Sequence, residues 1–433
     1  MASAVCMAVG FVKASSTAEI RKETVDHHRV ETVDVSRLPP EEIGRNRSVL
    51  IVGGTVAGSN TALALNKLCP HLRVVVGGRN RQKGDKVVAT LGENSEFAQV
   101  DIGNVRSLKA AMKDVDLVVN AAGPFDYMEC NVLEAAIQSK TAYIDVSDSK
   151  RYAQRAKSYK NKAMAAGYSL HLSSIFLHDL WFWLHFTGFK VSVVMAAVLV
   201  HNARSESRGE LESIRFNYYT CGSGGAGRGV LATSYFLLGD EAVTYNKGEK
   251  VKFSPYSSML NIDFGEGIGK QDVFLLNLPE VESAHEVLQV PTVSGRFGTG
   301  PFFWNWTLSA ITRLVPTNFL RDQRIVQMLV QFSYPLIRAV DVITGEIMSI
   351  KVDLECSDGY NTTAIFSHKR LSEAAGAATA AFALAVLEGS TKPGVWYPEE
   401  PEGISIEARE TLLRRVADGA INSVITKSFC RRK

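Results

Sequence analysis

The sequence predicts an α/β protein that begins with a doubly wound parallel sheet and continues with an α+β domain. Strands and helices alternate strictly from residue 48 to residue 146, and a glycine-rich turn follows the first of these strands. The regular alternation stops near residue 166. Strict alternation with short connections is typical of right-handed β-α-β units, and these units build parallel sheets with helices on both faces.

Five strands are expected in the first domain, residues 48–167. The first strand is the continuous aliphatic run SVLIV at residues 48–52, and such runs are typical of strands buried on both faces of a parallel sheet. The other strands are expected at residues 72–76, 97–102, 116–119 and 142–146. The helices between them are expected at residues 59–68, 81–91, 107–112 and 127–139.

The second domain, residues 193–370, is expected to be α+β with a mainly antiparallel sheet. A strand at residues 214–220 precedes a glycine-rich loop at residues 222–229 and a helix at residues 230–238. Further strands are expected at residues 273–278, 348–356 and 362–367, and Asp358 with Gly359 predicts a hairpin turn between the last two. The final segment, residues 371–433, is expected to form helices, with the clearest patterns at residues 372–387 and 406–416.

Two segments do not fit the domain pattern. Residues 1–47 are expected to be a disordered lead; residues 1–16 contain no acid and also fit a transit segment, and residues 17–47 are charged like a linker. Residues 168–192 form an atypical segment rich in aromatic side chains. Its most apolar window, residues 181–200, contains His185 and Lys190, so a buried core segment or an apolar surface patch is favoured over a membrane span.

The composition argues against nucleic-acid and metal binding. The formal net charge is only +3, whereas nucleic-acid binding through charge normally requires a basic excess or a basic stripe. The six cysteines are scattered without a C-x-x-C pair, and the nine histidines do not join them at metal-ligand spacing. Neither nucleic acid nor a metal ion is therefore an expected partner.

The turn after the first strand predicts a phosphate-binding site. Its candidate residues are Gly53, Gly54, Thr55 and Gly58, between a buried strand and a helix. A helix N-terminus offers unpaired backbone N–H groups and a positive dipole end to a pyrophosphate, and glycines allow the close approach. A turn that only connects the two elements is the alternative.

The end of the second strand favours NADP over NAD. NAD enzymes usually place an acid there to bind the ribose 2′-hydroxyl, but this chain carries Arg79 and Asn80, with Arg81 and Lys83 close by and no acid before Asp85. A guanidinium group can bind a 2′-phosphate through paired charge-assisted hydrogen bonds. The alternative is the solvated start of a charged helix.

The later strand ends supply the remaining candidates for cofactor contact. Asp101 follows the third strand and either borders the adenine or belongs to a turn. The fourth strand ends in small residues that let a nicotinamide lie against the backbone; these candidates are Asn120, Ala121, Ala122, Gly123, Pro124 and Phe125.

The fifth strand ends near three side chains that could transfer a proton. They are Tyr143, Asp145 and Asp148, and nothing in the sequence ranks them. Hydrogen bonding at the strand end is the favoured alternative for all three, so the catalytic residues stay unassigned.

These motifs together resemble the NADP-binding domain of saccharopine dehydrogenase-like proteins. The resemblance rests on VVNAAGPF at residues 118–125, YIDVSD at residues 143–148 and the Gly-Gly-Thr turn. Residues 218–229 and the phrase GVWYPEE at residues 394–400 resemble the plant and cyanobacterial branch. The resemblance implies an N-terminal Rossmann-type domain, a second domain with a sheet covering the crevice, and C-terminal helices that return to the first domain.

The sequence departs from this family in two places. Relatives usually carry a phosphate turn of the form Gly-Gly-Thr-Gly-x-x-Gly, and the turn here is about two residues shorter and lacks the glycine after Thr55. Relatives usually continue after the fifth strand unit into a strand and a Gly-x-x-Pro-Gly turn, which the aromatic-rich residues 168–190 replace. The first departure affects pyrophosphate binding, and the second affects the substrate side of the crevice.

Two functions are therefore weighed. The first is an NADP-dependent oxidoreductase that transfers a hydride with a small amino acid-derived substrate. The second is a catalytically inactive nucleotide-binding scaffold. A peripheral membrane role for residues 176–200 is a third hypothesis, although membrane contact is not expected; homo-oligomerisation is left open. A chloroplast location is favoured, with the cytoplasm as the alternative.

Overall fold

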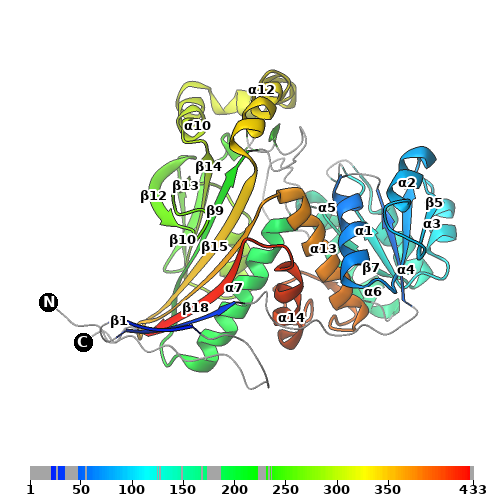
Figure 1. The fold of residues 1–433 in the computed structure, drawn as a ribbon, viewed down its shortest axis with the longest axis horizontal. Helices are drawn as coiled ribbons and strands as arrows, with labels where there is room; N and C mark the ends of the chain where they lie inside the picture. The colour runs from blue at the N-terminus through cyan, green and yellow to red at the C-terminus, as the bar shows by residue number, and fades with distance from the viewer. Residues whose placement is uncertain are drawn as a thin grey trace. The chain divides into compact units, whose positions relative to one another are not determined.

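The computed structural model describes residues 21–25, 28–34, 47–53, 56–123, 125, 128–147, 150–166, 169–172, 187–222, 231–232, 235 and 237–429 (Figure 1). The chain forms two compact units. The parallel-sheet unit contains residues 40–191 and 372–416. The mixed-sheet unit contains residues 1–39, 192–371 and 417–433.

The parallel-sheet unit has the doubly wound architecture that the sequence predicts. Among the described residues its sheet has seven strands in the order β17-β8-β7-β6-β3-β4-β5, and each neighbouring pair is parallel. The chain first moves outward from β3 through β4 to β5, and then returns to β6 on the other side of β3. The strands are β3 (Ser48–Val52), β4 (Arg73–Gly78), β5 (Ser95–Gln99), β6 (Leu117–Asn120), β7 (Ala142–Asp145), β8 (Ser169–Leu172) and β17 (Gly394–Trp396).

Capping side chains and a left-handed residue mark the ends of three helices in this unit. Asn80 caps α2 by accepting a hydrogen bond from the Lys83 amide (3.0 Å), and Asn104 caps α3 in the same way. Lys140 ends α4 in the left-handed conformation. The early helices are α1 (Val56–Leu68), α2 (Arg81–Val88), α3 (Val105–Met112), α4 (Asn131–Ser139), α5 (Lys150–Lys157) and α6 (Lys160–Ala166).

Two C-terminal helices belong to this unit, α13 (Leu371–Leu387) and α14 (Ile406–Val416). Gly376 of α13 packs so closely on α1 that an added Cβ would lie 2.6 Å from the Asn60 carbonyl carbon. The expected return of the C-terminal helices to the first domain is therefore confirmed.

The mixed-sheet unit has the mainly antiparallel sheet that was expected. In the described part of the chain this sheet has eleven strands, with β1-β2-β18-β16-β15-β9-β14-β10-β11 as its main path and β12 and β13 attached beside β14. The pair β9–β14 is parallel, and the other described pairs are antiparallel. The strands are β1 (Arg21–Val25), β2 (His28–Asp34), β9 (Leu211–Cys221), β10 (Ala242–Asn246), β11 (Glu249–Phe253), β12 (Ser257–Asp263), β13 (Lys270–Leu275), β14 (Thr292–Gly300), β15 (Ile347–Cys356), β16 (Tyr360–His368) and β18 (Asn422–Phe429).

Helix α7 (Thr187–Glu206) carries the apolar run 191–200, of which residues 192–200 belong to the mixed-sheet unit. Every residue in this run is buried, and the Tyr218 hydroxyl of β9 donates a hydrogen bond to Ser192 Oγ (2.8 Å). Burial is therefore confirmed for residues 191–200, whereas residues 173–186 of the same stretch lie outside the described residues. Within the described residues, no helix is long and apolar enough to cross a membrane.

Some strands lie where the sequence predicted none. Residues 21–34 were expected to be part of a linker, but β1 and β2 pair with each other, and β2 pairs with β18. Residues 371–433 were expected to be helical, but β17 and β18 lie among them. Likewise, β8 extends the parallel sheet after the alternation was thought to stop. Each of these strands is short or pairs with a segment remote in sequence, so local pattern alone did not reveal it.

Some predictions fall outside the described residues. They concern residues 1–20, the aromatic run 173–186, the glycine-rich loop at residues 223–230 and much of the helix expected at residues 230–238.

The remaining described helices of the mixed-sheet unit are α9 (Glu280–Glu286), α10 (Phe303–Leu314), α11 (Thr317–Arg321) and α12 (Gln323–Thr344).

Candidate dinucleotide-binding site

The candidate site lies at the carboxyl ends of β3, β4 and β6 in the parallel-sheet unit. Strand order reverses between β3 and β6, because β4 lies on one side of β3 and β6 lies on the other. In open parallel sheets, ligands bind outside the carboxyl ends of the strands at this reversal. The strand ends are tied together there: the Gly53 amide donates to the Gly77 carbonyl (3.0 Å), and the Ala121 amide donates to the Val52 carbonyl (2.7 Å).

Glycine is required at two positions of the turn after β3. Gly53 has a φ of +119°, and a Cβ added there would lie 2.6 Å from the Ala121 carbonyl carbon. A Cβ at Gly58 would lie 2.2 Å from the Gly53 carbonyl oxygen. The start of α1 therefore packs directly on the turn, as the fingerprint glycines of a pyrophosphate site require. Gly54 and Thr55 are outside the described residues.

The end of β4 presents an exposed arginine without a nearby acid in the turn. Arg79 is exposed, whereas Asn80 uses its side chain to cap α2. Arg81 and Asp85 form an exposed pair one helical turn apart, at 3.7 Å. Thus the capping bond gives Asn80 a structural role, and Arg79 is the exposed cation that directly follows β4.

Asp101 forms a turn after β5. Its Oδ1 atom accepts a hydrogen bond from the Gly103 amide (3.0 Å), and its own amide donates to Ser107 Oγ (3.3 Å). Of the two readings of this residue, the turn is the one that the structure describes. The side chain remains exposed, so the turn does not prevent contact with a ligand.

Asn120 braces the loop that follows β6. It is buried, and its Oδ1 atom accepts a hydrogen bond from the Ala122 amide (3.2 Å). Its Nδ2 atom donates to the Tyr143 hydroxyl (3.2 Å) and the Tyr152 hydroxyl (3.4 Å). This network holds the backbone at Ala122, and the bond from the Ala121 amide to Val52 holds the preceding residue beside the glycine turn. Pro124 lies outside the described residues.

Tyr143 and Asp145 are held in hydrogen bonds at the end of β7. The Tyr143 and Tyr152 hydroxyls are 2.8 Å apart, and burial raises the pKa of both well above the usual range. Asp145 is buried, and its Oδ1 atom accepts a hydrogen bond from the Ser147 amide (3.0 Å). These contacts match the favoured strand-end interpretation of both residues. Asp148 is outside the described residues.

Sequence reasoning missed two α5 residues that complete this region. Tyr152 packs edge-on against the buried ring of Phe125, with 5.1 Å between ring centroids, and Arg155 donates a hydrogen bond to the Met128 carbonyl (2.7 Å). Burial also raises the pKa of the neighbouring Cys130 thiol to about 11, in spite of the Arg155 charge. The only sequence signal was the spacing of Tyr152 and Arg155, which places them on one face of a helix.

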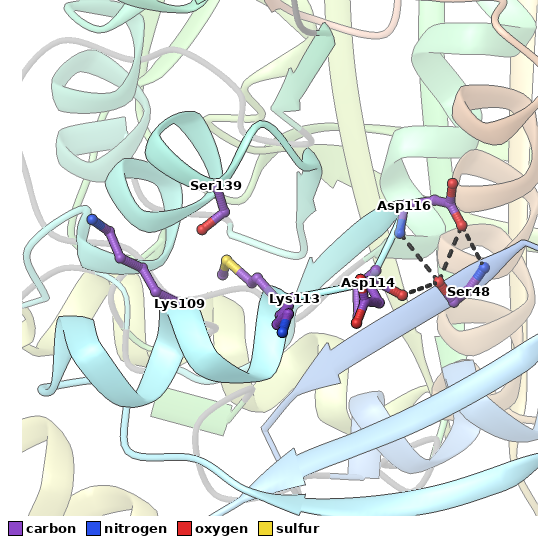
Figure 2. A pocket seen from close by; sticks show the side chains of 8 residues that line it. Ser48, Lys109, Lys113, Asp114, Asp116 and Ser139 are labelled. Atoms are coloured by element: carbon purple, nitrogen blue, oxygen red, sulfur yellow. Dashed lines mark hydrogen bonds between the residues drawn. The ribbon is translucent and has the colours of Figure 1, made fainter.

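A separate pocket of about 520 Å³ lies at the other end of the strands, opposite the candidate site (Figure 2). Ser48 begins β3, so this pocket is at the amino ends of the strands, away from the glycine turn. Of the two acids that line it, Asp116 accepts hydrogen bonds from Arg47 Nη1 (2.9 Å) and the Ser48 amide (2.8 Å). Burial opposes ionisation, but these bonds bring the pKa of Asp116 below its usual value. The contacts serve to join the first strand to the turn before β6.

Residues 49–170 match the family model for the saccharopine dehydrogenase NADP binding domain. This segment resembles the cofactor domain of saccharopine dehydrogenases. All of the candidate cofactor residues, from Gly53 to Phe125, lie inside it. The match supports the family resemblance that the sequence motifs predicted.

Solved structures show the same fold over most of the chain. Apo saccharopine dehydrogenase (L-Glu forming) from Saccharomyces cerevisiae is 12% identical, with a TM-score of 0.65 over 88% of this chain and 99% of that one. Homospermidine synthase from Legionella pneumophila, in complex with NAD, is 10% identical, with a TM-score of 0.53 over 88% and 91%. A comparison with curated proteins finds no match.

The saccharopine dehydrogenase fold agrees with the two units described above. It joins a parallel-sheet domain to a second domain with a mixed, mainly antiparallel sheet. The shared fold accounts for the architecture, and at these identities it does not assign a substrate.

Proposed function

We propose that this protein is an NADP-dependent oxidoreductase of the saccharopine dehydrogenase-like type, acting on a small amino acid-derived substrate. The observation that carries the proposal is the turn between β3 and α1. There, Gly53 and Gly58 leave no room for a Cβ, at the point where the strand order reverses. The cofactor would supply or accept the hydride, and the protein would bind and orient it.

The preference for NADP is proposed from the charge at the end of β4. Arg79 is exposed there, and the first acid, Asp85, lies within α2 and faces Arg81. A carboxylate directly after the strand would repel a 2′-phosphate, and none is present from Gly77 to Gly84. The family model for an NADP binding domain supports this preference.

The substrate would bind beside the loop that Asn120 braces. This loop follows β6, next to the glycine turn, and its backbone is fixed by the Ala122 amide bond to Asn120. A rigid loop of small residues allows the nicotinamide ring to lie flat near the substrate. Tyr143 and Tyr152 support that loop through their hydrogen bonds to Asn120. Both phenols are buried, and we assign them no part in proton transfer.

Cofactor titration tests the proposal. Purified protein is titrated with NADPH and with NADH, and binding is followed by nicotinamide fluorescence. NADPH should bind more tightly than NADH, and Arg79→Ala should weaken NADPH binding by roughly 10-fold or more, since a charge-assisted hydrogen bond is worth about 1.5–3 kcal/mol. Binding of NADH should be unchanged.

A matched arginine provides the control for this titration. Arg106 is an exposed residue of α3 in the same unit, and Arg106→Ala should leave both affinities unchanged. The assignment of Arg79 is wrong if NADH binds more tightly than NADPH to the parent protein. The proposal as a whole is wrong if neither nucleotide binds.

A second candidate, a nucleotide-binding scaffold without turnover, is favoured by one observation. Tyr143 and Asp145, the described candidates for proton transfer, are buried in hydrogen bonds. A scaffold should bind NADPH but should not oxidise it in the presence of imines formed from amino acids and small aldehydes or keto acids. Stopped-flow absorbance of NADPH under single-turnover conditions separates the two functions.

We also propose the finer assignments made from sequence. They are membership of the plant and cyanobacterial branch, a chloroplast location directed by residues 1–16, and homo-oligomerisation. Fusion of residues 1–47 to a fluorescent protein tests the location, and sedimentation of the purified chain tests the oligomeric state.

A further inference from the structure

One face of the mixed sheet carries charged side chains on three neighbouring strands, and we call this group the polar face. Side chains alternate between the two faces of a strand, and the pairing of β9 with β14 and with β15 brings six polar residues side by side on one of them. They are Arg215, Asn217, Arg296, Lys351, Asp353 and Glu355. The opposite face of β9 carries Ile214, Phe216 and Tyr218, which are buried.

Both carboxylates of the polar face already have cationic partners. Glu355 forms an ion pair with Arg215 on the adjacent strand. Asp353 lies 3.7 Å from the Lys351 ammonium nitrogen, and it also accepts a hydrogen bond from Asn217 Nδ2 (3.2 Å). These two pairs account for two of the three cations on this face.

Arg296 is the third cation, and within the described residues it has no acidic partner. Its Nη1 atom donates a hydrogen bond to Ser294 Oγ (2.8 Å). Its Nε atom is buried and lacks a partner among the residues that the structure describes, although a guanidinium group carries five N–H donors. Most of the donors of Arg296 are therefore left for a group from outside the described chain.

A bound water molecule alone would not complete this arrangement. Asn217 is 1% exposed, and its buried Oδ1 atom also lacks a partner in the described part of the chain. Asn217 lies opposite Arg296 in the register of β9 and β14, so one water molecule between Oδ1 and Nε would satisfy both atoms. It would leave the charge of Arg296 without a counter-ion, and a charge removed from bulk water is costly when it is unpaired.

The charges of the polar face do not cancel. The face holds three cations, including Arg296, and two carboxylates, which were counted above with their partners, so one positive charge is in excess. Burial lowers the pKa of Arg296 below its usual value, and the like charge of Arg215 lowers it further. The surroundings within the chain thus disfavour the charged guanidinium group, and a bound anion would offset this cost.

An apolar cluster borders the polar face next to these charges. Tyr219, the next residue of β9 on the same face, packs against Phe264 and Val273 of the β12–β13 hairpin, and the Tyr219 and Phe264 ring centroids are 5.9 Å apart. The hairpin also lies directly on β14, because a Cβ added at Gly298 would lie 2.1 Å from the Asp272 carbonyl oxygen. Water is excluded on this side, and a contact between charges is stronger where water is excluded.

We propose that Arg296 binds the carboxylate group of a small organic acid, with Arg215 beside it. A guanidinium group binds a carboxylate through two parallel charge-assisted hydrogen bonds. One carboxylate also matches the single excess charge, whereas a phosphate group carries about −1.5 to −2 at pH 7. The apolar cluster around Tyr219 suits the carbon chain of such an acid. This site is additional to the candidate cofactor site, because Arg296 belongs to the mixed-sheet unit.

Urea unfolding of the full chain without nucleotide tests the proposal. The probe is sodium butyrate, compared with sodium chloride at the same ionic strength. The parent protein should unfold at higher urea concentrations in butyrate, since an anion that binds only the folded state stabilises it. The dissociation constant obtained from this shift should rise roughly 10-fold or more in Arg296→Gln, because paired charge-assisted hydrogen bonds are lost.

Three controls make the test specific. Salts also act on the whole protein surface, so the relevant quantity is the difference between the butyrate shifts of the parent and the variant. Arg313→Gln, at an exposed arginine of α10 in the same unit, should keep the full butyrate shift. Sodium phosphate should give a smaller difference between the parent and Arg296→Gln than butyrate gives. Arg296→Lys keeps the charge but lacks the planar fork; it should fold like the parent and bind butyrate more weakly, so it supplies the comparison if Arg296→Gln does not fold.

Three results would overturn the proposal. The first is unfolding of the parent at the same urea concentration in butyrate and in chloride. The second is an equal butyrate shift in the parent, Arg296→Gln and Arg296→Lys. The third is a larger difference between parent and variant in phosphate than in butyrate, which would assign the site to phosphate.

Discussion

Two glycine positions show how a single atom can decide both stability and binding. Gly58→Ala would place a Cβ 2.2 Å from the Gly53 carbonyl oxygen, with backbone rather than a flexible side chain in the way. We expect unfolding to become easier by about 1–3 kcal/mol, as for other overpacked sites, and NADPH affinity to fall because the turn must move. Urea unfolding and fluorescence titration measure the two effects. Gly103→Ala, whose Cβ would find its nearest neighbour at 3.5 Å, should retain full stability.

The stability of the mixed-sheet unit should depend on pH because this unit contains a buried acid, Asp240. Burial raises the pKa of Asp240 to about 6, although Arg321 lies 3.2 Å away and opposes the rise. The folded state therefore binds this proton more tightly than the unfolded state, so stability should decrease as the pH rises from about 4 to about 6 and level off above that. The change should be no more than about 3 kcal/mol.

Comparison with Asp240→Asn isolates this group from the other acids. The difference in unfolding free energy between parent and variant should vary across that pH window, and urea unfolding at several pH values measures it. The exposed Glu249→Gln of β11 is the control. Parallel curves for the parent and Asp240→Asn would contradict the prediction.

At the scale of elements, β18 is fixed to its neighbours by a buried ion pair. Lys427 of β18 is 3% exposed and is paired with Glu206 of α7, which also accepts a hydrogen bond from the Tyr360 hydroxyl of β16 (3.1 Å). Lys427→Met should destabilise the protein by about 1–3 kcal/mol, because it leaves the partly buried Glu206 carboxylate without its cation. In contrast, Lys252→Met removes the exposed pair with Glu241 and should leave stability almost unchanged, because exposed ion pairs contribute little. Chemical denaturation compares the two, and equal losses would refute the argument.

The elements also show what the sequence could predict and what it could not. Four strands of the first domain were predicted because each is an apolar run followed by a turn signal and a helix. The third was placed at residues 97–102, whereas β5 spans Ser95–Gln99 and is only partly buried. The strands β8, β17 and β18 were missed because they are short or gain their stability from distant partners. The glycine turn and Arg79 follow two of these strand ends, as the sequence predicted, and their contact with a cofactor stays a prediction. The roles of Tyr152 and Arg155 were not, since their partners Asn120 and Met128 are brought near them only by the fold.

For the whole molecule, the division into two units predicts where cofactor protection will appear. The candidate cofactor residues belong to the parallel-sheet unit, which also contains α13 and α14. Hydrogen exchange of the full chain with and without NADPH should show slower exchange in residues 48–147 and 372–416. At 100 times its dissociation constant the cofactor should stabilise this unit by about 2.7 kcal/mol. Exchange in strands β15 and β16 of the mixed-sheet unit should change little. Equal slowing of exchange in both units would contradict the placement of the cofactor site in the parallel-sheet unit.

The three-residue strand β17 has a consequence for synthesis of the chain. It pairs in parallel with β8, but about 220 residues separate the two in the sequence. While the polypeptide emerges from the ribosome, the outer edge of β8 therefore has no partner until β17 has been synthesised. Open strand edges invite pairing with other nascent chains, so the interval between synthesis of β8 and synthesis of β17 is when the growing polypeptide is most open to such pairing.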